Sequence, residues 1–236
     1  KIMVCISENS REKELQYIDL LYSHRVLGIV VCSHIGETME HLDSNCPLIS
    51  FEREIAENIP AVLCDNYQGG ILAANRLFDA GCRNIAIFNP PTKENIPAYS
   101  REKAFMKCCE DKKISGRVVY TDRLAPLSEE FGNNILELLK KNSDLDGIFA
   151  TSDVMAANII RACKKMGKRV PEDISIVGFD DTWISTLTYP SITTIHQPVQ
   201  EMCEYAIEAI VKKVKSEKVP SQVVFPVELI DRESTK

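Results

Sequence analysis

Short runs of apolar residues alternate along the chain with longer segments in which apolar residues recur every three or four positions. The short runs are typical of strands buried on both faces, and the longer segments are typical of amphipathic helices. This alternation predicts parallel βα units and therefore an α/β fold. Strands are expected at residues 3–6, 28–32, 48–51, 61–64, 85–88, 118–121, 147–150, 174–177 and 223–225, and helices at 12–24, 69–80, 101–112, 128–141, 153–166 and 199–215.

Several of the predicted strands are followed directly by polar side chains. These are Ser33 and His34, Asp65 and Asn66, Thr151 with Ser152 and Asp153, and Asp180 with Asp181. Open α/β sheets bind ligands beyond the carboxyl ends of their strands, so the pattern indicates a polar rim along such an edge. A carboxylate there can accept hydrogen bonds from a neutral ligand. Turn chemistry explains any single ending equally well, because Asp and Ser commonly follow a strand.

Composition narrows the class of protein. The chain has 236 residues and a net charge of −6, with its Lys and Arg scattered, so the chain by itself is a poor candidate for nucleic-acid binding. No run approaches the roughly 18 apolar residues that span a bilayer, and the first residues do not look like a signal peptide. The nine cysteines include no Cys-x-x-Cys pair and lie mostly in apolar segments, which favours a reducing, cytoplasmic compartment.

Enzymatic and cofactor chemistry has little support in the sequence. The four histidines show no metal-ligand spacing, so no metal is expected. Gly69-Gly70 is only a pair and not a phosphate-cradling loop, and the Gly-x-Ser-x-Gly nucleophile pattern is missing, so neither a cofactor nor an enzyme is predicted. His196 is interpreted as a polar residue of a crossover segment, because a catalytic base needs a nucleophile placed against it.

Four motifs, taken in order, resemble those of one protein family. They are residues 64–70 with 77 and 80–85, the run from Arg101 to Phe105, residues 170–198 (Val-Pro-Glu-Asp through Gly-Phe-Asp-Asp to Thr-Thr-Ile-His-Gln-Pro), and residues 226–235. Together they are similar to the effector-binding core of the lac-repressor/galactose-repressor (LacI/GalR) family of bacterial transcription regulators, itself similar to periplasmic sugar-binding proteins. Ala104 and Cys203 depart from the family pattern, which commonly has Gly at both places, and we interpret both as adjustments of packing.

The resemblance implies a fold of two doubly wound parallel-sheet subdomains joined by three crossovers, the periplasmic binding protein-like type I fold. Residues 1–88 with 197–221 are expected to form the N-terminal subdomain, and residues 89–196 with 222–236 the C-terminal one. The crossovers are then expected at 89–91, 193–197 and 216–221. The family's first βα unit, of roughly thirty residues, and its helix-turn-helix DNA-binding domain are expected to lie outside this chain.

The resemblance also implies a function and a site. The chain is expected to be the sensing core of a cytoplasmic repressor and a homodimer, which binds a sugar or sugar phosphate in a cleft between its lobes. Binding would alter operator affinity through the DNA-binding domain. The expected ligand-binding residues are Arg101, Asp180, Ser152, Asp153, Gln197, Glu52, Arg53 and Leu124, with Pro126 as an alternative to the last.

Two other functions remain open at this point. One is a secreted sugar-binding protein of a transport system, which the scattered cysteines disfavour. The other is an α/β enzyme with a nucleotide cofactor, which would require a phosphate loop that the sequence does not show.

Overall fold

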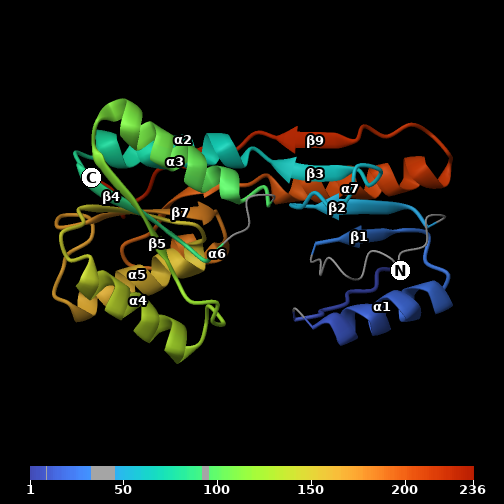
Figure 1. Ribbon diagram of the computed structural model, residues 1–236, viewed down its shortest axis with the longest axis horizontal. Coiled ribbons are helices and arrows are strands. Elements are labelled where there is room, and N and C mark those ends of the chain that lie inside the picture. Colours follow the sequence, from blue (N-terminus) through green and yellow to red (C-terminus); the bar gives the residue numbers. More distant parts are fainter. Residues whose placement is uncertain (9, 33–45, 92–95) are drawn as a thin grey trace. The chain divides into compact units, whose positions relative to one another are not determined.

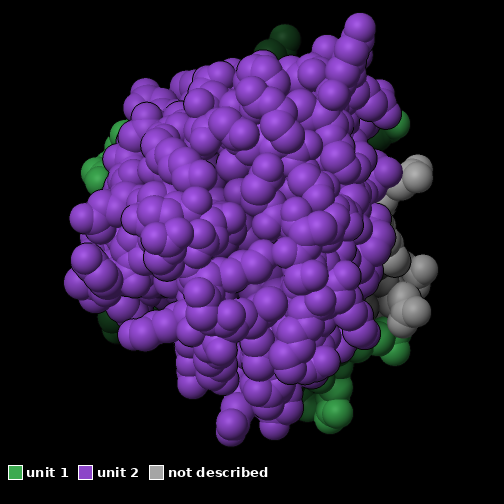
Figure 2. Space-filling model, turned by 90° about the vertical axis from the view of Figure 1, so that its left-hand side faces the viewer, with its two compact units in different colours: residues 1–64, 198–225 green, residues 65–197, 226–236 purple. Residues whose placement is uncertain are grey.

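The computed structural model describes residues 1–8, 10–32, 46–91 and 96–236. The chain divides into two compact units, which are shown as ribbons in Figure 1 and by colour in Figure 2. Unit 1 consists of residues 1–64 and 198–225, and unit 2 of residues 65–197 and 226–236. Each unit contains a sheet of mainly parallel strands with helices, so the predicted α/β class is confirmed. No helix in the described ranges is long and apolar enough to cross a membrane.

Unit 1 is built on a parallel sheet in the order β1-β2-β3-β9. Helix α7 packs across β1, β2 and β3. Its buried residues Met202, Ala206 and Ala209 recur at helical spacing, which is why one face of α7 can lie on the sheet. The elements are α1 (Arg11–Ser23), β1 (Ile29–Val31), β2 (Leu48–Phe51), β3 (Ala61–Cys64), α7 (Val199–Val214) and β9 (Gln222–Phe225).

The prediction of a strand at residues 3–6 is wrong. These residues form no strand, and the Ile2, Val4 and Ile6 side chains are 87 %, 82 % and 67 % exposed. An apolar run becomes a strand only when a neighbouring strand takes up its backbone hydrogen bonds. Within the described part of the chain, no strand is paired with this segment.

Unit 2 is built on a sheet in the order β10-β8-β7-β6-β4-β5, in which only β10 is antiparallel to its neighbour. Helices α2 and α3 lie side by side on one face, and α4 and α5 lie on the other (Figure 1). Strands β8 and β10 were not predicted from the sequence. The elements are α2 (Asn66–Asp79), β4 (Asn84–Asn89), α3 (Tyr99–Lys112), β5 (Ser115–Tyr120), α4 (Glu129–Lys141), β6 (Gly147–Ala150), α5 (Asp153–Lys165), β7 (Ser175–Asp180), α6 (Trp183–Leu187), β8 (Thr193–His196) and β10 (Glu228–Ile230).

The unit boundaries differ from the expected ones. Residues 65–88 were expected in the N-terminal subdomain, but β4 hydrogen-bonds to β5 and β6, and α2 packs on α3, so this segment belongs to unit 2. Residues 222–225 were expected in the C-terminal subdomain, but as β9 they pair with β3 of unit 1. The chain therefore passes between the units after residues 64, 197 and 225, and the break at 89–91 lies inside unit 2.

Helices α2 and α3 approach each other closely at Gly70. A Cβ atom added there would lie 2.3 Å from the backbone oxygen of Arg101 and 3.0 Å from the Cβ of Ala104. Only a residue without a side chain permits this distance between the two helix backbones. The contact fixes the position of α3, and with it the point from which the Arg101 side chain extends.

Gly70→Ala is expected to destabilise the protein by about 1–3 kcal/mol, because the new methyl group meets backbone that cannot move aside cheaply. Gly132→Ala is the matched control. It lies inside α4, where an added Cβ would come no closer than 3.5 Å to the Asn158 side chain, so the change is expected to be neutral or stabilising by up to about 1 kcal/mol. Urea unfolding monitored by circular dichroism measures both. Equal midpoints for the two variants would contradict the close-packing argument.

Candidate functional site

Polar side chains collect at the carboxyl edge of the unit 2 sheet. Strands β4, β6, β7 and β8 are parallel, so their carboxyl ends meet at one edge. After β4 the chain forms β5 on one side of β4 and then β6 on its other side. The boundary between β4 and β6 is therefore a topological switch point. Ligands of open α/β sheets bind at such points. Asn89 ends β4, and Thr151 directly follows β6, so both lie at the switch point.

Arg101 extends from the first turn of α3 to this edge and is held from three sides. Its Nε donates to the Asn66 Oδ1 at 2.5 Å, and its Nη1 donates to the Thr151 backbone oxygen at 3.2 Å. The guanidinium lies over the Phe179 ring, 3.4 Å from the ring centroid, where cation–π attraction favours it. The residue is 7 % exposed. Arg101 is therefore a positively charged group in a fixed orientation beside the switch point.

Asp180 ends β7 in a strained backbone conformation. Its φ angle is 105°, and that of Asp181 is 57°, a region that residues other than Gly rarely adopt. The Gln197 Nε2 donates to the Asp180 Oδ1 at 2.6 Å, which joins the ends of β7 and β8. Local strain persists only where the surrounding contacts impose it, and it is common at functional sites.

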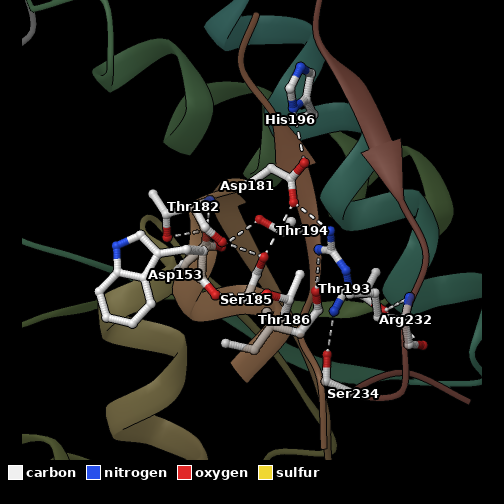
Figure 3. Close-up of polar contacts among 12 residues, drawn as sticks. Asp153, Asp181, Thr182, Ser185, Thr186, Thr193, Thr194, His196, Arg232 and Ser234 are labelled. Carbon is white, nitrogen blue, oxygen red and sulfur yellow. Dashed lines mark hydrogen bonds and ion pairs between the residues drawn. The ribbon is translucent and has the colours of Figure 1, made fainter. Parts of the chain in front are cut away.

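Asp153 begins α5 and is fully buried. Its Oδ2 accepts hydrogen bonds from the Thr182 backbone N at 2.6 Å and the Thr182 hydroxyl at 3.0 Å, and its Oδ1 accepts from the Thr194 hydroxyl at 2.6 Å (Figure 3). Burial raises the pKa of Asp153, although these hydrogen bonds act in the opposite direction. With 0 % exposure, the carboxylate holds the surrounding segments together instead of facing solvent.

Asp181 is the centre of a second polar cluster, which was not predicted from the sequence. It accepts hydrogen bonds from the Arg232 Nη2 at 2.6 Å, the Ser185 hydroxyl at 3.3 Å and the His196 Nδ1 at 3.0 Å (Figure 3). Burial alone would raise the pKa of Asp181, but the hydrogen bonds from Arg232 and His196 outweigh it and the pKa is lowered. The cluster joins the end of β7, β8 and the C-terminal segment of the chain.

A third network was also missed and lies at the ends of β4, β5 and β6. Asn89 donates to the Glu102 Oε2 at 3.2 Å and accepts from the Thr151 hydroxyl at 3.2 Å. The Tyr120 hydroxyl donates to the Glu102 Oε1 at 3.0 Å, which raises the pKa of Tyr120. The buried hydroxyl of Thr121 has no hydrogen-bond partner among the described residues. The switch point is thus lined by amide, carboxylate and hydroxyl groups.

The remaining predicted residues lie in different places. The Ser152 hydroxyl accepts from the Met155 backbone N at 3.2 Å and so caps α5, and Leu124 is 37 % exposed after β5. Glu52 and Arg53 follow β2 in unit 1, where Glu52 accepts hydrogen bonds from the Cys64 backbone N and, at 3.6 Å, from its thiol. Six of the eight predicted residues therefore belong to unit 2 and two to unit 1.

Comparison with known proteins gives one consistent family. Residues 74–235 match the periplasmic binding protein-like domain. The chain is 31 % identical over 236 residues to the ribose operon repressor of Halalkalibacterium halodurans, covering all of this chain and 70 % of that protein. A periplasmic binding protein/LacI transcriptional regulator from Alkaliphilus metalliredigens in complex with D-xylulofuranose has a TM-score of 0.86 and 32 % identity, covering 99 % of this chain and 87 % of that one.

A LacI family transcriptional regulator from Enterococcus faecium with bound ribose is also similar. Its TM-score is 0.81 and its identity 27 %, with 94 % of this chain and 84 % of that chain covered. The chain belongs to the LacI family. The resemblance found in the motifs of the sequence is therefore confirmed, and so is the type I periplasmic binding protein-like fold.

In this LacI-family core, the family motifs contain only some of the residues that the structure brings together at this edge. Arg101 belongs to a family motif and is held at the switch point, and Asp180 and Gln197 belong to another motif and are joined by a hydrogen bond. The Asp181 cluster also joins two family motifs, since Arg232 comes from the terminal one. The two consecutive carboxylates at 180 and 181 gave no sign of this partner, because Arg232 lies 51 positions further along the chain.

Asp181→Asn is expected to flatten the acid side of the pH–stability curve. Because the folded state lowers the pKa of Asp181, its contribution to stability is present above the unfolded pKa of about 4 and is lost as the pH falls through the lower folded pKa. Asn tolerates the positive φ of this position. Urea unfolding at pH values between about 6 and about 2.5 measures the effect.

The control for this pH series is Glu110→Gln, an exposed carboxylate on α3. It is expected to retain the acid-dependent loss of stability seen in the parent protein. An unchanged acid slope in Asp181→Asn would show that the Asp181 cluster does not stabilise the fold.

Proposed function

We propose that this chain is the effector-sensing core of a LacI-type transcriptional repressor and that the carboxyl edge of unit 2 binds an uncharged small sugar. The observation that carries the proposal is the fixed guanidinium of Arg101 at the switch point. A sugar hydroxyl is both a donor and an acceptor, so its site needs donors and acceptors side by side. Arg101 supplies a rigid fork of donors, and Asn89 and Asp180 supply acceptors.

The charges at this edge favour a neutral sugar over a sugar phosphate. The edge carries the carboxylates of Glu102, Asp153, Asp180 and Asp181 and the guanidinium groups of Arg101 and Arg232. Arg232 is paired with Asp181. A phosphate brought to this edge would be repelled by more negative charges than attract it, and the repulsion is strong where water is excluded.

A pentose is the first effector to test. The ribose operon repressor of H. halodurans is 31 % identical to this chain, and the A. metalliredigens and E. faecium regulators hold D-xylulofuranose and ribose. As in any two-state regulator, the sugar can change operator affinity only by the difference between its affinities for the two states of the protein. Operator binding through a DNA-binding domain, a homodimer and a cytoplasmic location are parts of the same proposal, and no catalytic step is included.

Neutral pentoses are expected to raise the melting temperature, and ribose 5-phosphate is not. A ligand at about 100 times its Kd adds about 2.7 kcal/mol to the stability of the native state. Differential scanning fluorimetry with ribose, xylulose, ribose 5-phosphate and cellobiose compares them directly. A shift produced by the phosphate and not by ribose would overturn the electrostatic argument.

Arg101→Lys is expected to weaken sugar binding at least about tenfold, because lysine keeps the charge but loses the fork of donors. Asp180→Asn is expected to weaken it to a similar degree by removing a charged acceptor. Isothermal titration calorimetry with the sugar identified above measures both. Arg117→Lys is the control, since Arg117 pairs with Asp144 and Asn84 at the opposite, amino edge of the sheet. Unchanged affinity in both site variants would remove this site assignment.

A further inference from the structure

Helix α7 runs antiparallel to strand β1 in unit 1. Val214, the last residue of α7, lines the same cavity as Leu27 and Pro47, which precede β1 and β2, so the helix ends at the amino edge of the sheet. Near its start, the Tyr205 ring contacts that of Phe225, the last residue of β9, with 5.9 Å between ring centroids. The first turns of α7 therefore lie at the level of the carboxyl ends of the parallel strands.

The periodicities of the strand and the helix bring two cysteines to the same place. A Cβ on Gly28 would lie 2.6 Å from the Ile210 side chain, so the face of β1 to which residue 28 belongs is covered by α7. Cys32 is four residues further along the strand and shares that face, because side chains alternate with period two. Cys203 is seven residues, or two turns, before Ile210 and shares its face of the helix.

The distances that the strand and the helix cover from the Gly28–Ile210 contact to the two cysteines also agree. Four strand residues after Gly28 advance about 13 Å towards the carboxyl edge. Seven helix residues before Ile210 advance about 10.5 Å in the same direction, because the elements are antiparallel. Cys32 and Cys203 are therefore brought to the same level between the same two elements.

The environment of the two thiols agrees with this placement. Burial of the sulfur, with a further contribution from the neighbouring Cys203, raises the pKa of the Cys32 thiol. Both residues are nonetheless exposed in part to solvent, unlike the buried Cys64 in the same unit, and both are free thiols. Cys203 also stands where the family pattern commonly has Gly.

We propose that Cys32 and Cys203 form a reversible intramolecular disulfide that makes this sensing core responsive to oxidation by low-molecular-weight disulfides such as glutathione disulfide. The Cys203 thiolate attacks one sulfur of the small disulfide, which releases one small thiolate and leaves a mixed disulfide on Cys203. The Cys32 thiolate then attacks the Cys203 sulfur and releases the second. One small disulfide is reduced to two thiols, and the protein dithiol is oxidised to one disulfide.

The disulfide would link β1 to the first turns of α7. The bond joins residues far apart in the sequence, so it restricts the unfolded chain strongly and is expected to raise the melting temperature. Helix α7 starts two residues after Gln197, whose side chain donates a hydrogen bond to Asp180. In a reducing compartment the pair stays open, and only oxidation closes it.

The test is oxidation of the chain with glutathione disulfide, followed by alkylation with N-ethylmaleimide and intact mass spectrometry. We expect the loss of two alkylatable thiols per chain, restored by dithiothreitol, and faster closure from about pH 7 to about pH 9 as more thiolate forms. Digestion with trypsin and a Glu-specific protease should join the Cys32 and Cys203 peptides. Both proteases are needed, because Cys32 and Cys46 share a tryptic peptide.

In Cys203→Ser, no disulfide within the chain is expected. Every remaining alkylatable thiol should therefore still react with N-ethylmaleimide, unless glutathione itself has been attached to it. Cys46→Ser, which removes another cysteine of unit 1, should form the disulfide as the parent does. Two results would overturn the proposal: a linkage between other cysteines, or no loss of thiols at any ratio of oxidised to reduced glutathione. Because the measurement needs no sugar, its failure is distinguishable from failure of the proposed effector site.

Discussion

The turn that carries Asp180 depends on one buried carboxylate. A charged group with no exposure to water is stable in a protein only when hydrogen bonds replace its hydration. Asp153 meets this requirement through the backbone N and hydroxyl of Thr182 and the hydroxyl of Thr194. These three bonds hold together the start of α5, the segment after β7 and the strand β8. Gly178 allows the approach, since a Cβ there would lie 2.5 Å from the Asp153 Oδ1.

The strained turn between β7 and α6 depends on that anchor. Asp180 and Asp181 both have positive φ angles, and the contacts around them must supply the energy that this conformation costs. On one side Thr182 is held by Asp153, and on the other Asp181 is held by Arg232 and His196. The turn leaves Asp180 at the edge of the sheet, joined to the neighbouring strand.

Arg101 reaches the same edge by an independent route. The contact of α2 with α3 at Gly70 sets the position of α3, and the Arg101 guanidinium packs against the face of the Phe179 ring. The donor proposed for the sugar is thus held by α3, and the proposed acceptors by the ends of β4 and β7, before any ligand arrives. A site organised in advance loses less entropy on binding than a flexible one.

The sequence by itself determined the α/β class and the family, because strand and helix periodicities and the motif at 170–198 are local properties of the chain. It also named Arg101, Asp180 and Gln197 among eight candidate ligand-binding residues, and their role in binding stays a prediction. The role of Asp153 required the tertiary structure, since burial depends on residues 29 and 41 positions away. The Asp181–Arg232 pair spans 51 positions and the unit boundaries follow strand pairing, so only the packed fold decided them.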